Sequence, residues 1–276
     1  MTVLQLKKFC LIFLLFCVLI LRLNAQDWEM GLSGGASGYM GDLNTSNFLQ
    51  FNDWSAGILI KKNLSRTWAV RMNFLRANIW GNGVKNSNEV IKQQRLFFQS
   101  PIYELSLVGE FNFFKFEPSF TQVSYSPYLF AGIAGFHFQP KSYNFDGDLV
   151  NLRNYQTEGV AYNSLSLGIP FGAGFKYNLR GPFTLGVEIG YRIAFTDYLD
   201  DISGWYIDPA DYPLNGDNAF QNQRNYFIDP SVSKIGDRYP KVQRGDGRKR
   251  DAYMIANFTL TYALFRAGCP VYIKGN

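Results

Sequence analysis

The chain has 276 residues and a formal net charge of +5, and 17% of its residues are aromatic, including 25 Phe and 17 Tyr. Beyond the first 25 residues no apolar run approaches the roughly 18 residues of a helical membrane span, which excludes such spans. Residues 1–25 carry three bases and no acid, so the remaining chain has a net charge of only +2, which gives no support for nucleic-acid binding.

The first segment, residues 1–25, has the layout of a secretory signal peptide. Lys7 and Lys8 form a basic start, residues 9–21 are all apolar, and Ala25 supplies the small residue before the cleavage point. The apolar run is shorter than the about 20 residues of a membrane helix. We therefore expect export and cleavage after Ala25. Only Cys269 of the three cysteines would remain, which predicts no internal disulfide.

Eight later segments alternate apolar and polar side chains with the period of a β-strand. In chain order they are residues 27–39, 54–61, 68–79, 102–115, 125–139, 165–178, 183–196 and 252–265. The clearest is residues 183–196, which is longer than the five or six residues of an ordinary globular strand and long enough for a tilted membrane strand. Pro170 interrupts the sixth segment and is expected to mark a bulge. The pattern predicts an all-β fold, an eight-stranded antiparallel up-and-down transmembrane β-barrel of the outer-membrane type, over residues 26–276.

The faces of these strands predict a polar lumen. In residues 102–115, for example, Tyr103, Leu105 and Leu107 alternate with acidic and small residues. The charged residues expected inside the barrel are Glu104, Glu110, Lys176, Glu188 and Arg192. Eight strands leave a lumen that side chains nearly fill, and opposite charges shielded from water must pair. We therefore expect a structural polar plug and no conducting pore.

The connections between the predicted strands alternate in length. Short ones cover residues 62–67, 116–124 and 179–182, and long ones cover residues 40–53, 80–101, 140–164 and 197–251. Outer-membrane barrels have short periplasmic turns and long extracellular loops. The short turns and both termini are therefore expected in the periplasm.

An acidic stretch, which contains Asp197, Tyr198, Asp200 and Asp201, opens the longest loop. Oxygen-rich clusters can hold Ca²⁺, but the spacing of a calcium loop with its central Gly and final Glu is absent. A solvated, turn-forming acidic loop is the expected structure, and ion binding stays open. Basic residues follow between positions 238 and 250, and they either fold onto the acidic half or contact partners or anionic lipid head groups.

Catalytic and cofactor motifs are weak. His137 is the single histidine, and its neighbours in the alternating pattern predict that it points into the barrel. A hydrolase needs a nucleophile, a base and an orienting acid within hydrogen-bond reach, and serine is too common in the sequence for a chance partner of His137 to indicate such a set. We expect a protein that is not an enzyme and has no cofactor and no metal-ligand motif.

Several blocks resemble one family. They are Gly41, Asp42, Leu43 and Asn44 after an aromatic residue, residues 127–132 with 136–138, residues 169–174, residues 187–190 leading to 195–201, and residues 269–270. These blocks are similar to those of the PorG-like outer-membrane barrels of Bacteroidota. The resemblance covers nearly the whole mature chain, with residues 197–251 the least matched part.

The resemblance implies a component of the type IX secretion system, the machine that exports cargo for gliding motility or virulence. It implies partners at the periplasmic face, a PorK/GldK-type lipoprotein and PorN/GldN-type ring subunits, and it implies no catalytic residues. Outer-membrane lipid is the other expected partner, with no nucleic acid and no small-molecule substrate. Two alternatives stay open: a cell-surface binding, adhesion or membrane-stabilising barrel that acts through its outer loops, and a lipid hydrolase.

Overall fold

The computed structural model describes residues 28–45, 49–119, 123–234 and 242–264, so the expected signal peptide and Cys269 lie outside the described residues. Eight long strands form a barrel. They are β1 Trp28–Met40, β2 Asp53–Asn63, β3 Trp68–Asn82, β4 Phe97–Asn112, β5 Tyr125–Phe138, β8 Leu165–Asn178, β9 Phe183–Ala194 and β10 Ala252–Ala263. All eight overlap the segments predicted from alternation.

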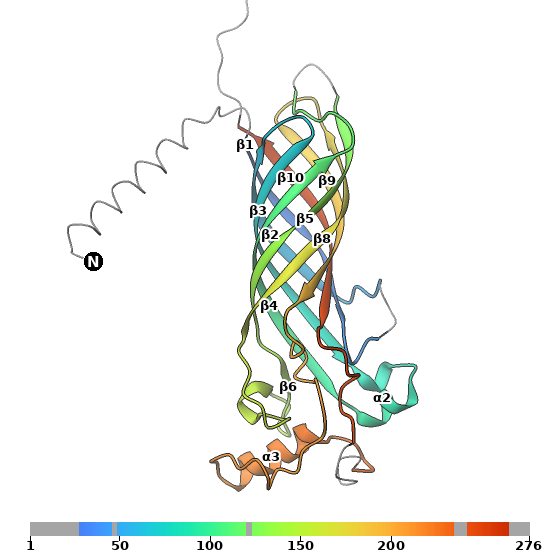
Figure 1. Ribbon diagram of the computed structural model, residues 1–276, viewed down its shortest axis with the longest axis vertical. Helices are drawn as coiled ribbons and strands as arrows, with labels where there is room; N and C mark the ends of the chain where they lie inside the picture. The colour runs from blue at the N-terminus through green and yellow to red at the C-terminus, as the bar shows by residue number, and fades with distance from the viewer. Residues whose placement is uncertain (1–27, 46–48, 120–122, 235–241, 265–276) are drawn as a thin grey trace, which may run out of the picture.

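The sheet closes on itself. Its long strands pair in the order β3, β2, β1, β10, β9, β8, β5, β4, and an additional pairing of β3 with β4 completes the ring. Every one of these pairs is antiparallel, and apart from the closing pair of β1 with β10 each pair joins two long strands that are consecutive along the chain. The predicted eight-stranded antiparallel barrel is confirmed, and Figure 1 shows its tilted strands.

Two details of the strands differ from expectation. β4 begins at Phe97 and not at residue 102, because its pairing with β3 continues past Pro101 to the pair Asn82–Phe97. Pro170 causes no bulge, because the pairing of β5 with β8 skips two positions there and resumes in the same register. A proline cannot donate to the ladder, but here its neighbours keep the strands aligned.

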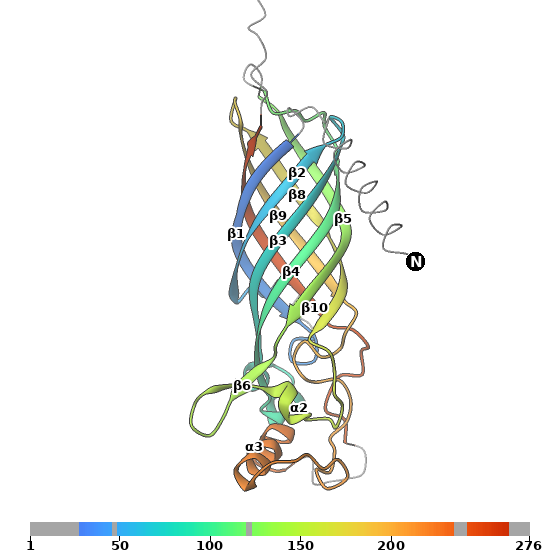
Figure 2. The same ribbon diagram turned by 90° about the vertical axis from the view of Figure 1, so that its left-hand side faces the viewer.

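The two ends of the barrel differ. At one end the strands are joined by short turns, and we call this the short-turn end. At the other end lie β6 Lys141–Tyr143, β7 Leu149–Asn151, the helices α2 Glu89–Gln94 and α3 Asn218–Ile228, and the 3₁₀ turns η2 Gly83–Lys85 and η3 Leu152–Tyr155. Figures 1 and 2 show these elements gathered beyond that end of the barrel. We call this end the cap, and it comprises the described residues of 41–52, 83–96, 139–164 and 195–251.

The outer wall of the barrel is apolar. Ile133 and Phe258 are 68% and 73% exposed, and Leu32, Leu105 and Leu167 also project outward. A closed barrel satisfies its backbone hydrogen bonds between strands, so an apolar outer wall suits a lipid bilayer. Within the described ranges, no helix is long and apolar enough to cross a membrane.

The inner wall is divided into a polar half and an apolar half. The polar half lies toward the short-turn end. Toward the cap, Ile79, Phe98 and Ile102 are buried in one cluster with Phe136 and Phe138. The polar lumen expected from the sequence is therefore found in the short-turn half and not in the cap half, where inward apolar side chains pack together in this cluster.

The orientation of His137 also corrects the sequence prediction. Its side chain is exposed on the outer wall, whereas Phe136 and Phe138 on either side are 1% and 0% exposed and point inward. The prediction took the aromatic face of this strand as the lipid face. It failed because these aromatic residues belong to the apolar half of the lumen.

Candidate functional site

The polar half of the lumen contains four acids and four bases among the described residues. The acids are Glu29, Glu104, Glu110 and Glu188, and the bases are Lys61, Arg71, Lys176 and Arg192. The eight residues come from six strands, β1, β2, β3, β4, β8 and β9, so the network ties opposite walls of the barrel together. The equal numbers of acids and bases leave the polar half electrically balanced.

Glu110 lies at the centre of this network. Its Oε2 atom is 2.9 Å from Lys176 Nζ, and its Oε1 atom is 3.2 Å from Arg71 Nε. Arg71 continues to Glu188, with its Nη1 atom 2.8 Å from Glu188 Oε2. Such charges are stable in a narrow lumen only when they are paired, and each of these three pairs brings opposite charges to within 3.2 Å.

Two further pairs extend the network along the barrel. Lys61 Nζ is 2.9 Å from Glu29 Oε2 near the short-turn end. Arg192 Nε is 3.3 Å from Glu104 Oε2, and the Tyr253 hydroxyl donates to the same oxygen at 2.8 Å. Glu104 therefore lies where the polar half meets the apolar half, since Tyr253 belongs to the buried apolar cluster.

Aromatic rings cover the cations of the network. Lys176 Nζ is 4.8 Å from the ring centres of both Phe116 and Tyr128, and the Arg71 guanidinium is 5.4 Å from that of Phe130. Phe116 follows β4 and is 2% exposed, so it fills the short-turn mouth of the lumen. Charge pairs and rings together leave the lumen filled.

Sequence reasoning placed five of these eight charges inside the barrel and missed Glu29, Lys61 and Arg71. The sequence contains the same alternation there, because charged Arg71 lies between apolar Val70 and Met72 just as Glu104 lies between Tyr103 and Leu105. The sequence prediction assigns no inner and outer faces to the first three strands, so it does not include these three charges.

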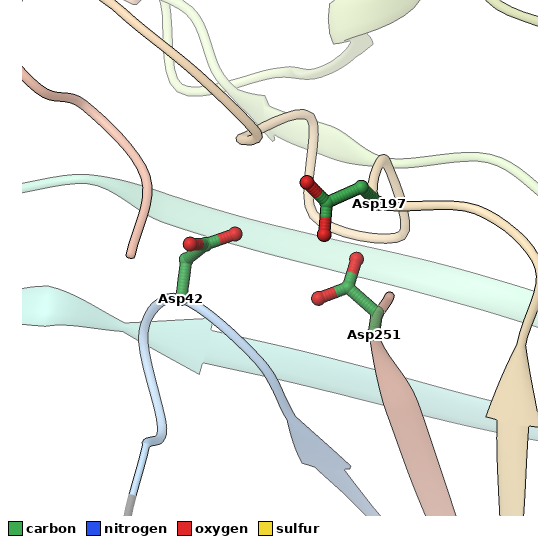
Figure 3. A group of neighbouring side chains, drawn as sticks. All are labelled: Asp42, Asp197 and Asp251. Carbon is green, nitrogen blue, oxygen red and sulfur yellow. The ribbon is translucent and has the colours of Figure 1, made fainter. Parts of the chain in front are cut away.

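A second cluster of charges lies where the barrel enters the cap. Asp42 in the β1–β2 connection, Asp197 after β9 and Asp251 before β10 bring one carboxylate oxygen each to within 4.8 Å of the others. Figure 3 shows the three side chains turned toward one another from three separate segments. The residues are far apart in sequence, and barrel closure brings them together through the β1–β10 and β10–β9 pairings.

Hydrogen bonds hold these carboxylates in place. The backbone N–H of Leu199 donates to Asp251 Oδ2 at 3.0 Å, and the Ser203 hydroxyl donates to Asp197 Oδ2 at 2.7 Å. Asp42 Oδ1 accepts the backbone N–H of Asp246. The cluster is therefore part of the structure that joins the long loop to the barrel.

The acidic stretch after β9 is buried, which corrects the expectation of a solvated loop. Asp200 and Asp201 are each 1% exposed. The Tyr39 hydroxyl donates to Asp200, and the hydroxyls of Thr157 and Tyr162 donate to Asp201 at 2.5 and 2.6 Å. The loop folds back into the cap, where these hydroxyls replace water, and local sequence carries no sign of such distant partners.

The other residues singled out from sequence occupy the same region. Gly41 and Asn44 exchange backbone hydrogen bonds at 3.2 and 3.0 Å, and Leu43 is buried in the apolar cluster. Tyr198 stacks on Tyr162 with ring centres 4.6 Å apart. The structure therefore brings residues 41–44 and residues 197–201 together in the cap, apart from the lumen network.

Burial changes the acidity of the carboxyls in this region. Burial raises the pKa of Asp42 to about 8 and the pKa values of Asp197 and Asp201 to about 6. Burial and the neighbouring carboxylates raise the pKa values of Asp200 and Asp251 well above the usual range. Three convergent carboxylates are also the oxygen ligands that a hard cation takes, so Asp42, Asp197 and Asp251 are the described residues that could hold a metal.

The basic half of the long loop reaches this region through Arg244, which sequence reasoning did not single out. Arg244 is 3% exposed, and its Nη1 atom is 3.0 Å from Glu158 Oε1 and donates to the Asp201 carbonyl at 2.7 Å. Of the two possibilities left open from the sequence, this residue shows the basic half folding onto the acidic half.

A family model described as a domain of unknown function, DUF6089, matches residues 7–211. The chain belongs to this family. The matched part of this DUF6089 protein contains Asp42, Asp197 and the lumen network, whereas Arg244 and Asp251 lie beyond it. No curated protein matches the chain in sequence.

Solved structures similar to the DUF6089 barrel are outer-membrane barrels. Neisserial surface protein A is 9% identical with a TM-score of 0.40, and the match covers 86% of this chain and 96% of that one. Ail, the attachment invasion locus protein of Yersinia pestis, is 11% identical with a TM-score of 0.37, covering 86% and 99%. OprG from Pseudomonas aeruginosa is 15% identical with a TM-score of 0.35, covering 87% and 97%.

Proposed function

We propose that this protein is a non-enzymatic outer-membrane barrel that serves as an anchor, with its short-turn end in the periplasm and its cap outside the cell. One observation carries the proposal: the lumen is filled by the paired charges around Glu110 and by the apolar cluster around Phe136. A barrel filled in this way has no path for solutes. The protein is therefore expected to act by binding partners at its two ends.

The more specific role is a component of the type IX secretion system that holds the periplasmic ring to the outer membrane. The blocks that resemble PorG-like barrels, including residues 41–44 and 195–201, support this role. The ring partners would be the PorK/GldK-type lipoprotein and the PorN/GldN-type subunits, and they would dock at the short-turn end.

The short-turn end offers a surface for such docking. A pocket of about 570 Å³ there is lined by Arg66, Phe114, Lys115, Glu117 and Tyr125. Arg66 and Glu117 form an exposed ion pair at 2.7 Å. Aromatic residues and Arg are enriched in protein interfaces, so this pocket, with Phe114, Tyr125 and Arg66 in its lining, is the part of the short-turn end that we expect to contact the ring.

The test is a pull-down of the tagged barrel from mild detergent, followed by identification of the retained proteins. We expect ring lipoprotein with the wild type, and a loss of at least tenfold with Phe114→Ala plus Lys115→Glu. The control pair Phe145→Ala plus Lys141→Glu changes the same residue types in the cap and should retain the ring. Absence of ring subunits from the wild-type sample, with normal secretion in a deletion strain, would exclude the role.

A second function, binding at the cell surface, is favoured by the folded cap. Its long loop is held by Arg244 and carries α3, and cap residues line further cavities. Deletion of residues 204–247 separates the two functions. Loss of surface binding with normal secretion and an intact barrel would favour surface binding, whereas no loss of either would favour the anchor, which docks the ring at the short-turn end.

A further inference from the structure

A pocket in the cap, which we call the cap pocket, has a volume of about 500 Å³, and its lining includes neither the lumen charges nor Asp42, Asp197 or Asp251. Four aromatic residues line it together with three acids, and the lining contains no Lys or Arg. The aromatic residues are Tyr198, Trp205, Tyr206 and Tyr212, and the acids are Glu158, Asp208 and Asp211.

One wall of the cap pocket is held by a stack of rings. Tyr198 stacks on Tyr162 at 4.6 Å with an interplanar angle of 7°, and Tyr162 stacks on Phe138 with an angle of 4°. Tyr162 also donates to Asp201 at 2.6 Å. The stack extends from the barrel core to the pocket, so the Tyr198 ring is fixed before any ligand arrives.

Another part of the pocket lining is a tight turn that carries Tyr212. The backbone N–H of Tyr212 donates to the Pro209 carbonyl at 3.3 Å, and Asp208 Oδ1 accepts the N–H of Ala210 at 2.9 Å. The Tyr212 ring lies against Gly159, where an added Cβ would be only 2.5 Å from the ring and where φ is +70°. Both facts require glycine at position 159.

The lining of the cap pocket includes Tyr206, whose hydroxyl has no hydrogen-bond partner among the described residues. Tyr206 is 3% exposed, and its buried hydroxyl has no hydrogen-bond partner. Burial raises the pKa of Tyr206 to about 12, so the hydroxyl keeps its proton.

The charge of the cap pocket comes from its outer edge. Glu158 is paired with Arg244 at 3.0 Å and accepts the backbone N–H groups of Ser203 and Gly204, so its charge is already compensated. Asp208 and Asp211 are exposed acids with no base in the lining to offset them. Trp205 is 54% exposed and presents a large ring to solvent beside them.

Rings and uncompensated carboxylates together select a positive charge. Trp and Tyr faces attract ammonium and guanidinium groups, and recognition is strongest where several rings surround the cation. An anion would be repelled by Asp208 and Asp211, and a neutral ligand would leave their attraction unused. We propose that the cap pocket binds an organic cation of the ammonium or guanidinium type, held by the aromatic walls and by Asp208 and Asp211.

Such a cation has two sources, a free small molecule or a basic side chain on a peptide, and both present the same group. The test uses the full barrel in detergent micelles and ligand-observed NMR titration. The probes are choline, its neutral isostere 3,3-dimethylbutan-1-ol, N-acetyl-lysine methylamide and methyl glucoside. We expect choline or the lysine derivative to bind at least tenfold more tightly than both neutral probes, and the tighter of these two cations identifies the source.

Variants assign the binding to this pocket. Asp211→Asn should weaken cation binding at least threefold, and Trp205→Leu should abolish it, whereas Trp205→Phe should keep part of it. Asp146→Asn, an exposed acid elsewhere in the cap, is the matched control and should bind like the wild type. Gly159→Ala should weaken binding by displacing Tyr212, and the mobility of the unheated barrel in gel electrophoresis checks that each variant is folded.

Three results would overturn the proposal. They are equal binding of choline and its neutral isostere, tighter binding of methyl glucoside than of either cation, and cation binding that Trp205→Leu and Asp211→Asn leave unchanged. None of these results bears on docking at the short-turn end, which the pull-down tests separately.

Discussion

Charge pairing between strands is the main feature at the scale of single residues. Glu110 forms direct ion pairs with Lys176 and Arg71, which come from two other strands. Removing one member of a buried set leaves the others uncompensated, and that loss costs far more than the loss of an exposed pair.

The first prediction concerns Glu110. We expect Glu110→Gln to lower the free energy of unfolding by about 3 kcal/mol, because two buried cations lose their shared carboxylate. Urea unfolding of the barrel in lipid vesicles measures the change. Glu117→Gln is the control, since it breaks the exposed pair with Arg66 and should change stability by less than about 1 kcal/mol. Equal effects of the two variants would show that the lumen network is not a stabilising element.

At the scale of elements, the seam where β10 meets β1 closes the barrel and depends on close backbone approach. A Cβ added at Gly35 would be 2.0 Å from the Ala256 carbonyl oxygen, whereas one added at neighbouring Gly34 would meet nothing within 4 Å. The two glycines on β1 are therefore a matched pair, one required by the seam and one not.

The second prediction uses this pair. Gly35→Ala should destabilise the barrel by about 1–3 kcal/mol because the seam must widen, and Gly34→Ala should have no effect or add a few tenths of a kcal/mol, since alanine suits a strand better. The measurement is the urea midpoint of unfolding in the same lipid. A larger loss for Gly34→Ala than for Gly35→Ala would contradict the close approach of the seam.

The third prediction concerns the acidic cluster of the cap. Its carboxyls have higher pKa values folded than unfolded, so they stabilise the fold when protonated. That stability is complete below the ordinary pKa near 4 and is lost as the pH rises through about 6 for Asp197 and Asp201 and about 8 for Asp42. Proteolysis of the cap should therefore be slower at pH 5 than at pH 9, measured with EDTA present to keep divalent cations away.

Asp42→Asn provides the control for this pH dependence. The amide keeps an acceptor for the Asp246 N–H and cannot ionise, so the variant should lose part of the difference between pH 5 and pH 9. A cap that resists protease equally at both pH values in the wild type would show that these carboxyls stay ionised in the fold.

The strands could be predicted from sequence because alternation is a local property. Phe183, Leu185 and Val187 share the lipid face whatever lies elsewhere in the chain. Phe136 and Phe138 could not be assigned in this way, because an aromatic residue facing lipid and one facing an apolar plug give the same pattern. The burial of Asp200 could not be predicted either, because its partner Tyr39 lies 161 positions away in the sequence.

At the scale of the whole molecule, two plugs lie one after the other along the barrel axis. The polar plug is centred on Glu110 and sealed by Phe116 and Phe130, and the apolar plug contains Phe136 and Phe138. The cap then covers the far end (Figure 2). Ions would have to cross a charge-paired region and then an apolar one.

The fourth prediction follows from this serial arrangement. The wild-type barrel in planar lipid bilayers should give no steady ion conductance, with a porin in the same membranes as positive control. Phe116→Ala combined with Phe130→Ala removes two of the rings that cover the cations of the polar plug. We still expect conductance to stay at the baseline, because Phe136 and Phe138 close the cap half. Persistent conductance steps in the wild type would contradict the filled lumen and, with it, the argument that the barrel works through its ends. Steps that appear only in the double variant would show instead that the polar plug is the sole barrier.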